Sequence, residues 1–118
     1  MCDKDTMVQF FDSMNNRDLE QMGAFLTQST EFYFPKSKAL IGRERILRFF
    51  KILFHKYPEL TFQIQRVIIQ GHQAAIHWTN CGINRKGEPY KNEGVTILEI
   101  EAGKISFLSD FFKDTEKF

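Results

Sequence analysis

GKISFLSDFF, residues 103–112, places alternating apolar and polar side chains after a glycine turn. The alternation predicts a β-strand, because successive side chains of a strand point to opposite faces. One face would carry Ser106, Leu108, Asp110 and Phe112, and the other Phe107, Ser109 and Phe111. Asp110 would lie between apolar neighbours, where desolvation raises the pKa of a carboxyl group and makes it a better proton acceptor near neutral pH. The alternative is a solvated or ion-paired carboxylate at a fraying strand end.

Three more strand-like segments precede this one and are separated by short turns. Alternation of apolar and polar residues begins at Leu60 and runs to a hairpin turn at Gly71-His72. The next two segments span 74–84 and 90–101, with a polar loop between them and a turn at Ala102-Gly103. Strands joined by such short connections are antiparallel. The second half of the chain is therefore predicted to form an antiparallel meander.

The first half of the chain has the spacing of helices. Apolar residues recur at i, i+3, i+4 and i+7 within 5–16, and a longer apolar stripe runs through 43–56. Asp18 suits the N-cap of a short second helix. A short aromatic strand is expected at 31–34, with a loop over 36–40 behind it. Helices placed before an antiparallel meander predict an α+β fold.

The composition is that of an ordinary globular protein, and it narrows the function classes. The chain has 118 residues, which fits one domain over 1–118, with 42% hydrophobic and 26% charged side chains. Its net charge is +1 and its basic residues are scattered among acidic ones, so neither a nucleic-acid partner nor disorder is indicated. The 13 Phe leave two interpretations: an unusually aromatic core, or rings that line a cavity or an interface.

Membrane and redox features are few. No apolar run approaches the roughly 20 residues that span a bilayer, and residues 1–5 are too short and polar for a signal peptide. Cys2 and Cys81 do not make a disulfide framework. We therefore expect a cytoplasmic protein with reduced thiols and no membrane partner, and a buried, unreactive Cys81.

The order helix, helix, strand, helix and four strands resembles the nuclear-transport-factor-2-like (NTF2-like) superfamily, and within it the SnoaL-like and ketosteroid-isomerase-like branch. The resemblance covers about residues 5–114. Three segments carry it: Asn16-Arg17-Asp18-Leu19; Phe34-Pro35 with Gly42-Arg43-Glu44-Arg45-Ile46; and Gly103-Lys104-Ile105 with Ser109-Asp110-Phe111-Phe112-Lys113-Asp114.

This resemblance implies a strongly bent sheet that wraps into a cone, with helices covering its mouth. It also implies an apolar pocket of small-molecule size and a homodimer through the outer face of the sheet. The first functional hypothesis is an isomerase, cyclase, dehydratase or hydrolase that uses general acid–base catalysis without a cofactor. The alternatives are a non-catalytic pocket for an apolar ligand and a protein-interaction module, since a fold does not determine a function.

Asp110 is the first candidate for a catalytic residue, because it matches a carboxylate that acts as base or acid in several relatives. Tyr33 is the second candidate, since a phenol can donate to developing negative charge, although a tyrosine with a satisfied hydroxyl in the core is the alternative. His77 is the third, because histidine is the side chain that changes charge most readily near physiological pH, provided that its face of the segment 74–84 lines the pocket.

The opposite face of that segment carries a different set of candidates. If it points inward, Trp78 is a wall of the pocket and Asn80 a polar anchor. The other expected ligand-binding residues are Leu108, Phe112, Phe50 and Phe54.

Other chemistries lack their motifs. His55, His72 and His77 do not have metal-ligand spacing, and the chain has no phosphate-cradling glycine loop or nucleophile elbow. In limonene-epoxide-hydrolase-like relatives, the strand that corresponds to 74–84 supplies an Arg and an Asp two residues apart. His77 and Thr79 occupy about those places here, so epoxide hydrolysis by that triad is not expected. We expect no metal and no cofactor.

Overall fold

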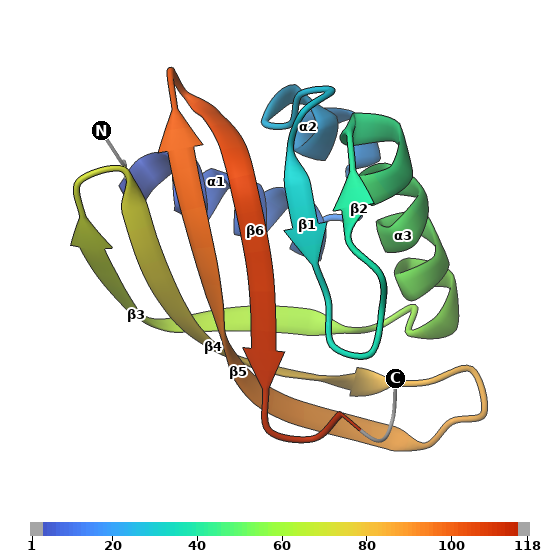
Figure 1. The fold of residues 1–118 in the computed structure, drawn as a ribbon. Coiled ribbons are helices and arrows are strands. Elements are labelled where there is room, and N and C mark those ends of the chain that lie inside the picture. Colours follow the sequence, from blue (N-terminus) through green and yellow to red (C-terminus); the bar gives the residue numbers. More distant parts are fainter. Residues whose placement is uncertain (1–3, 116–118) are drawn as a thin grey trace.

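The computed structural model describes residues 4–115 as helices packed on a curved sheet (Figure 1). In chain order the elements are α1 (Lys4–Asn15), α2 (Leu19–Ala24), β1 (Glu31–Tyr33), β2 (Leu40–Ile41), α3 (Arg43–Lys56), β3 (Thr61–Gln70), β4 (Gln73–Ile83), β5 (Pro89–Glu101) and β6 (Lys104–Phe112). The predicted α+β fold is confirmed. None of the helices within 4–115 is long and apolar enough to cross a membrane.

The strands form one sheet in the order β2-β1-β6-β5-β4-β3. Strands β3 to β6 are antiparallel neighbours, whereas β1 runs parallel to β6. The register shifts at Gln65 between β3 and β4, and at Ser106 between β5 and β6. Such bulges bend and twist a sheet. Figure 1 shows the resulting sweep of β3, β4 and β5 around the helices.

The helices cover the concave face of this sheet. Every second residue of β4 and β5 is buried there, from Ala74 to Asn80 and from Tyr90 to Ile100. The apolar stripe predicted for α1 is buried against that face, and so is most of the stripe on α3. The intervening residues of β4 and β5 lie on the opposite side, the outer face, and most of them are partly exposed.

Arg17 fixes the turn between α1 and α2 to the end of α3. Its backbone is in the left-handed region, with φ of 56°. Its guanidinium donates to the carbonyl oxygens of Tyr57 at 3.3 Å and Pro58 at 2.7 Å. The carboxylate of Asp18 then accepts from the backbone N–H of Gln21 at 3.0 Å, as predicted for an N-cap. These contacts set the positions of the helices over the concave face.

Three details differ from the sequence-based expectation. Leu40 and Ile41 form a short strand that pairs with β1. The sequence predicts a loop over 36–40, so this strand begins at the last residue of the predicted loop. Ile105 is fully buried while Ser106 is the extra residue of a bulge, so the inward face of β6 changes phase there. Cys81 is exposed rather than buried, because its side chain belongs to the outer face. Cys2 lies outside the described residues.

Candidate functional site

A small cavity lies between the concave face and the helices. Its volume is about 30 Å³. Its lining is largely aromatic and consists of Phe10, Phe11, Met14, Phe32, Phe34, Phe50, Leu53, Phe62, Trp78, Asn80, Thr96, Leu108, Asp110 and Phe112. Bulk water occupies roughly 30 Å³ per molecule, so the closed cavity has room for little more than a water molecule. Side chains fill most of the cone, and a larger occupant requires rings to rotate.

Half-buried rings form the wall next to Asp110. Phe34 follows β1, and its ring centroid lies 5.3 Å from that of Phe112 at the end of β6. Phe112 also contacts Trp78, with the centroids 6.2 Å apart. Both phenylalanines are partly exposed. They are therefore lining rings next to Asp110 that reach solvent on one side.

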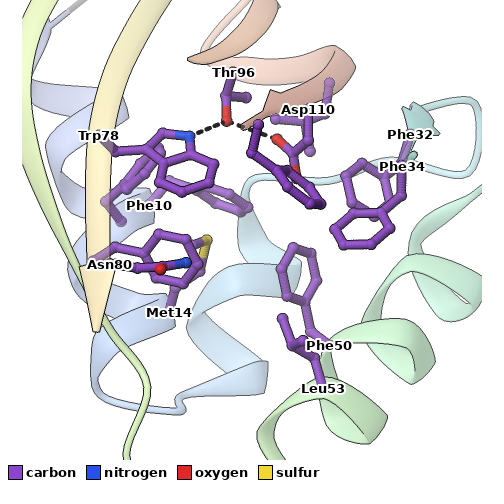
Figure 2. Close-up of a pocket in the computed structure, with 14 residues that line it drawn as sticks. Phe10, Met14, Phe32, Phe34, Phe50, Leu53, Trp78, Asn80, Thr96 and Asp110 are labelled. Carbon is purple, nitrogen blue, oxygen red and sulfur yellow. Dashed lines mark hydrogen bonds between the residues drawn. The ribbon is translucent and has the colours of Figure 1, made fainter. Parts of the chain in front are cut away.

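A chain of hydrogen bonds crosses the cavity wall from β4 to β6 (Figure 2). The indole N–H of Trp78 donates to the hydroxyl oxygen of Thr96 at 2.9 Å. The Thr96 hydroxyl donates to Oδ1 of Asp110 at 2.6 Å. An indole can only donate and an ionised carboxylate can only accept, so the direction of both bonds is fixed when Asp110 is ionised. Oδ1 of Asp110 is the acceptor of this bond in the structure.

Burial raises the pKa of Asp110 to about 6, while the hydrogen bond from Thr96 opposes that rise. The other lining residues bring no positive charge to the carboxylate: none of them is Lys, Arg or His. A carboxyl group in this state exchanges a proton close to neutral pH. While Thr96 donates to Oδ1, Oδ2 is the oxygen that can take up a proton.

Gly94 on β5 allows Trp78 on β4 to lie close to the end of β6. It is the β5 residue paired with Trp78 on β4 and with Phe112 on β6. A Cβ atom there would lie 2.3 Å from the carbonyl oxygen of Phe111 and 2.8 Å from Cζ2 of Trp78. The absence of a side chain therefore allows the indole and the end of β6 to meet beside Asp110.

The structure brings six of the predicted site residues to the cavity: Asp110, Trp78, Asn80, Leu108, Phe112 and Phe50. It resolves the two alternatives for β4, because Trp78 and Asn80 are on the concave face. Phe54 does not line the cavity. Its ring packs behind that of Phe50, with centroids 5.9 Å apart.

Tyr33 and His77 lie on the outer face, away from Asp110. On β1 it is Phe32 that points inward, so Tyr33 is exposed and its hydroxyl donates to the Glu31 carboxylate at 2.7 Å. The Nε2 atom of His77 is 2.5 Å from the Glu93 carboxylate, which also accepts from Lys113 at 2.9 Å. The structure does not bring either residue together with Asp110.

Sequence reasoning missed Thr96 and most of the aromatic lining. Thr96 is the polar member of the buried run Gly94, Thr96, Leu98 and Ile100, and this break in an apolar face is a signal that was available. Within residues 4–115, no three His, Cys, Asp or Glu side chains gather closely enough to hold a metal ion. The cavity wall likewise has no cationic group that could hold a phosphate-bearing cofactor.

The sequence matches the model of the SnoaL-like domain over residues 7–108. The chain belongs to the SnoaL-like family. Asp110 lies just beyond the segment matched by this family model. The predicted membership is confirmed. A search of curated proteins gives no match.

Solved structures of SnoaL-like and NTF2-like proteins share the fold. A candidate SnoaL-like polyketide cyclase from Jannaschia sp. CCS1 superposes with a TM-score of 0.83 at 18% identity, covering 92% of this chain and 83% of that one. A candidate ketosteroid isomerase from Kribbella flavida DSM 17836 gives 0.77 at 24% identity, covering 95% and 78%. TerC, co-crystallised with polyporic acid, gives 0.84 at 16% identity, covering 92% and 89%.

Proposed function

We propose that this SnoaL-like protein is a cofactor-independent enzyme that moves a proton on a small, largely apolar molecule, with Asp110 as its general base and acid. The observation that carries the proposal is a single carboxyl group, held by Thr96, in the wall of a largely apolar cavity. Isomerisation, cyclisation, dehydration and hydrolysis can all use such a group. General bases are most effective when their pKa lies near the working pH.

The hydrogen bond from Thr96 assigns different roles to the two oxygens of Asp110. Oδ1 stays bonded to the hydroxyl at 2.6 Å, so Oδ2 is the atom left to take a proton from a substrate. A carbon–hydrogen bond next to a carbonyl group is a suitable target: the carboxylate takes the proton on Oδ2, and the electron pair moves to the carbonyl oxygen as an enolate. Where the enolate is conjugated with a carbon–carbon double bond, return of the proton to the far carbon of that double bond completes an isomerisation.

The names of the structural neighbours support this reaction class. They include a candidate polyketide cyclase and a candidate ketosteroid isomerase, and TerC was crystallised with polyporic acid. An apolar ligand-binding protein without catalysis is the second candidate, favoured by the largely aromatic lining of the cavity. Acceleration of proton exchange distinguishes the two, because a carrier binds the molecule without exchanging its protons.

Titration of Asp110 by carbon-detected NMR tests the acid–base site. We expect a midpoint near 6 in the unmodified protein. Thr96→Val removes a hydrogen bond to the charged form, so the pKa is expected to rise by about one further unit. Thr79→Val, the same change on β4 but on the outer face, serves as the control and should leave the midpoint unchanged. A midpoint near the ordinary value of 3.8 contradicts the proposed base.

We also propose that two copies associate through the outer face of the sheet. Phe111 on β6 and Ile68 on β3 are 59% and 62% exposed there. Between them, Val95, Ile97 and Ala75 continue an apolar surface across neighbouring strands. Exposed apolar surfaces of this kind mark interaction sites.

Ile68→Glu is expected to convert a dimer to a monomer, because it introduces a charge into the apolar surface. Light scattering would then give 13.9 kDa in place of about twice that mass. Ile69→Glu is the matched control, since Ile69 is also exposed but faces the concave side opposite Ala74. A monomeric unmodified protein, or dissociation caused equally by both variants, would refute this interface.

A further inference from the structure

Asn80 carries a buried polar atom that no protein group satisfies. The residue is 6% exposed and lies in the cavity lining. Its Oδ1 atom has no hydrogen-bond partner among the described residues. Buried carbonyl oxygens nearly always have a partner, so a lone one beside a cavity indicates an occupant that donates to it.

Other polar side chains near Asn80 are already engaged. Asn92, its pairing partner on β5, donates to the Tyr90 hydroxyl and to the Asp114 carbonyl, both at 2.8 Å. Its Oδ1 accepts from the backbone N–H groups of Glu93 at 3.0 Å and Asp114 at 3.1 Å. The N–H of Trp78 is bonded to Thr96. Asn80 therefore differs from its neighbours in lacking a protein partner for its oxygen.

Asn80 and Asp110 lie at two different ends of the cavity lining. Asp110 pairs through Thr96 with Ile76 on β4, and Asn80 lies four residues further along that strand. This is an offset of roughly 13 Å along β4 at the usual strand rise. Figure 2 shows the Asn80 side chain apart from that of Asp110, which lies beside Thr96. One occupant can meet both ends only with an apolar body between them.

The rest of the lining restricts the chemistry of that body. It is mostly aromatic, and rings pack favourably edge to face against such walls. It contains no Lys, Arg or His, so nothing there would neutralise a carboxylate or phosphate on a ligand. The cavity accordingly favours a neutral aromatic molecule.

We propose that the substrate is a neutral aromatic compound bearing a hydroxyl group, and that this hydroxyl donates to Oδ1 of Asn80 while the reacting part lies toward Asp110. The inference rests on the proposed function and adds the substrate class and its anchor. The rings of Phe34 and Phe112 would rotate to admit it, since the closed cavity holds only about 30 Å³.

Phenol, toluene and benzaldehyde test the anchor, because they share one ring and differ in their polar group. By calorimetry, phenol is expected to bind the unmodified protein about tenfold more tightly than toluene, which corresponds to one net hydrogen bond. Asn80→Leu, of similar shape, should abolish that preference. In the unmodified protein, phenol but not toluene should shift the NMR signals of the Asn80 side-chain amide.

Four results would overturn the inference. They are equal affinity for phenol and toluene, a preference unchanged in Asn80→Leu, an Asn80-dependent preference for benzaldehyde, which only accepts hydrogen bonds, and no binding of any probe, which would leave water as the partner of Asn80. A preference lost in Asp110→Asn but kept in Asn80→Leu would place the hydroxyl at Asp110. The proposed base would survive each of these results if Asp110 titrates near 6, so the two failures are distinguishable.

Discussion

Asp110→Asn is expected to abolish catalysed proton exchange at the carbon next to a carbonyl group. Phenylacetone in deuterated water is a suitable probe, since it joins one ring to an acidic CH₂ group and its exchange is followed by proton NMR. A positioned general base typically contributes about 10²–10⁴-fold, and this is the expected loss of rate. Asparagine keeps the shape and the acceptor oxygen for Thr96 but cannot take the proton.

Asp12→Asn is the matched control for this experiment. Asp12 is an exposed carboxylate on α1, away from the cavity lining, so its variant should exchange phenylacetone at the unmodified rate. If the unmodified protein exchanges no faster than buffer, or if Asp110→Asn retains its rate, Asp110 is not the base for this chemistry.

Asp110→Asn also has an expected effect on the free energy of unfolding, and the sign of that effect follows from the pKa of Asp110. The pKa of Asp110 is raised from 3.8 to about 6 on folding, so ionisation is harder in the folded state. The unmodified protein is therefore most stable with respect to this group below pH 4, where the carboxyl group is protonated. Its free energy of unfolding falls by up to about 3 kcal/mol as the pH rises through 6. Asp110→Asn should be at least as stable at pH 8, and denaturant titration would show that lost exchange is not lost folding.

Gly94→Ala is expected to cause the largest loss of stability of any single methyl addition near the site. The new Cβ would lie 2.3 Å from the Phe111 carbonyl oxygen and 2.7 Å from Cβ of Phe112. Relief requires β5 and β6 to separate, because the first of these atoms belongs to the backbone. Overpacking typically costs 1–3 kcal/mol, and a backbone clash places this variant at roughly 3 kcal/mol or more. Urea unfolding measures the loss.

Lys91→Ala on the same strand is the control, because Lys91 is exposed and its truncation should change stability by less than about 0.5 kcal/mol. A Gly94→Ala protein as stable as the unmodified one would show that the strands relax easily. The close approach of Trp78 to the end of β6 would then not depend on the glycine.

Local patterns were sufficient for the helices, for the longer strands and for the inward position of Asp110, whereas non-local geometry was needed for the rest of the site. Alternation over 103–112 predicted the strand and the inward position of Asp110. The phase error at Ser106 arose because a bulge is set by the register with β5, which a single strand does not encode. Leu40 and Ile41 were missed for a similar reason, since so short a strand exists through its pairing with β1.

The sequence did not decide which face of β4 points toward the cavity, because both faces carry polar and large side chains. Trp78 and Asn80 alternate with His77 and Thr79, and burial depends on which side the helices cover. Tyr33 stands between two phenylalanines, so the local sequence did not distinguish inward from outward. Thr96 gains its meaning from Asp110 and Trp78, which lie on two other strands.

The pairing of β1 with β6 has a consequence for how the protein folds. Although β6 is the last described strand in the chain, it lies between β1 and β5 in the sheet. The Thr30 hydroxyl at the start of β1 donates to the Ile105 carbonyl at 2.6 Å, across 75 positions of sequence. Contacts this distant slow folding, because a long loop must close before they form. The strand that carries Asp110 thus joins two distant parts of the chain, and the carboxyl group reaches its apolar surroundings only when the sheet is complete.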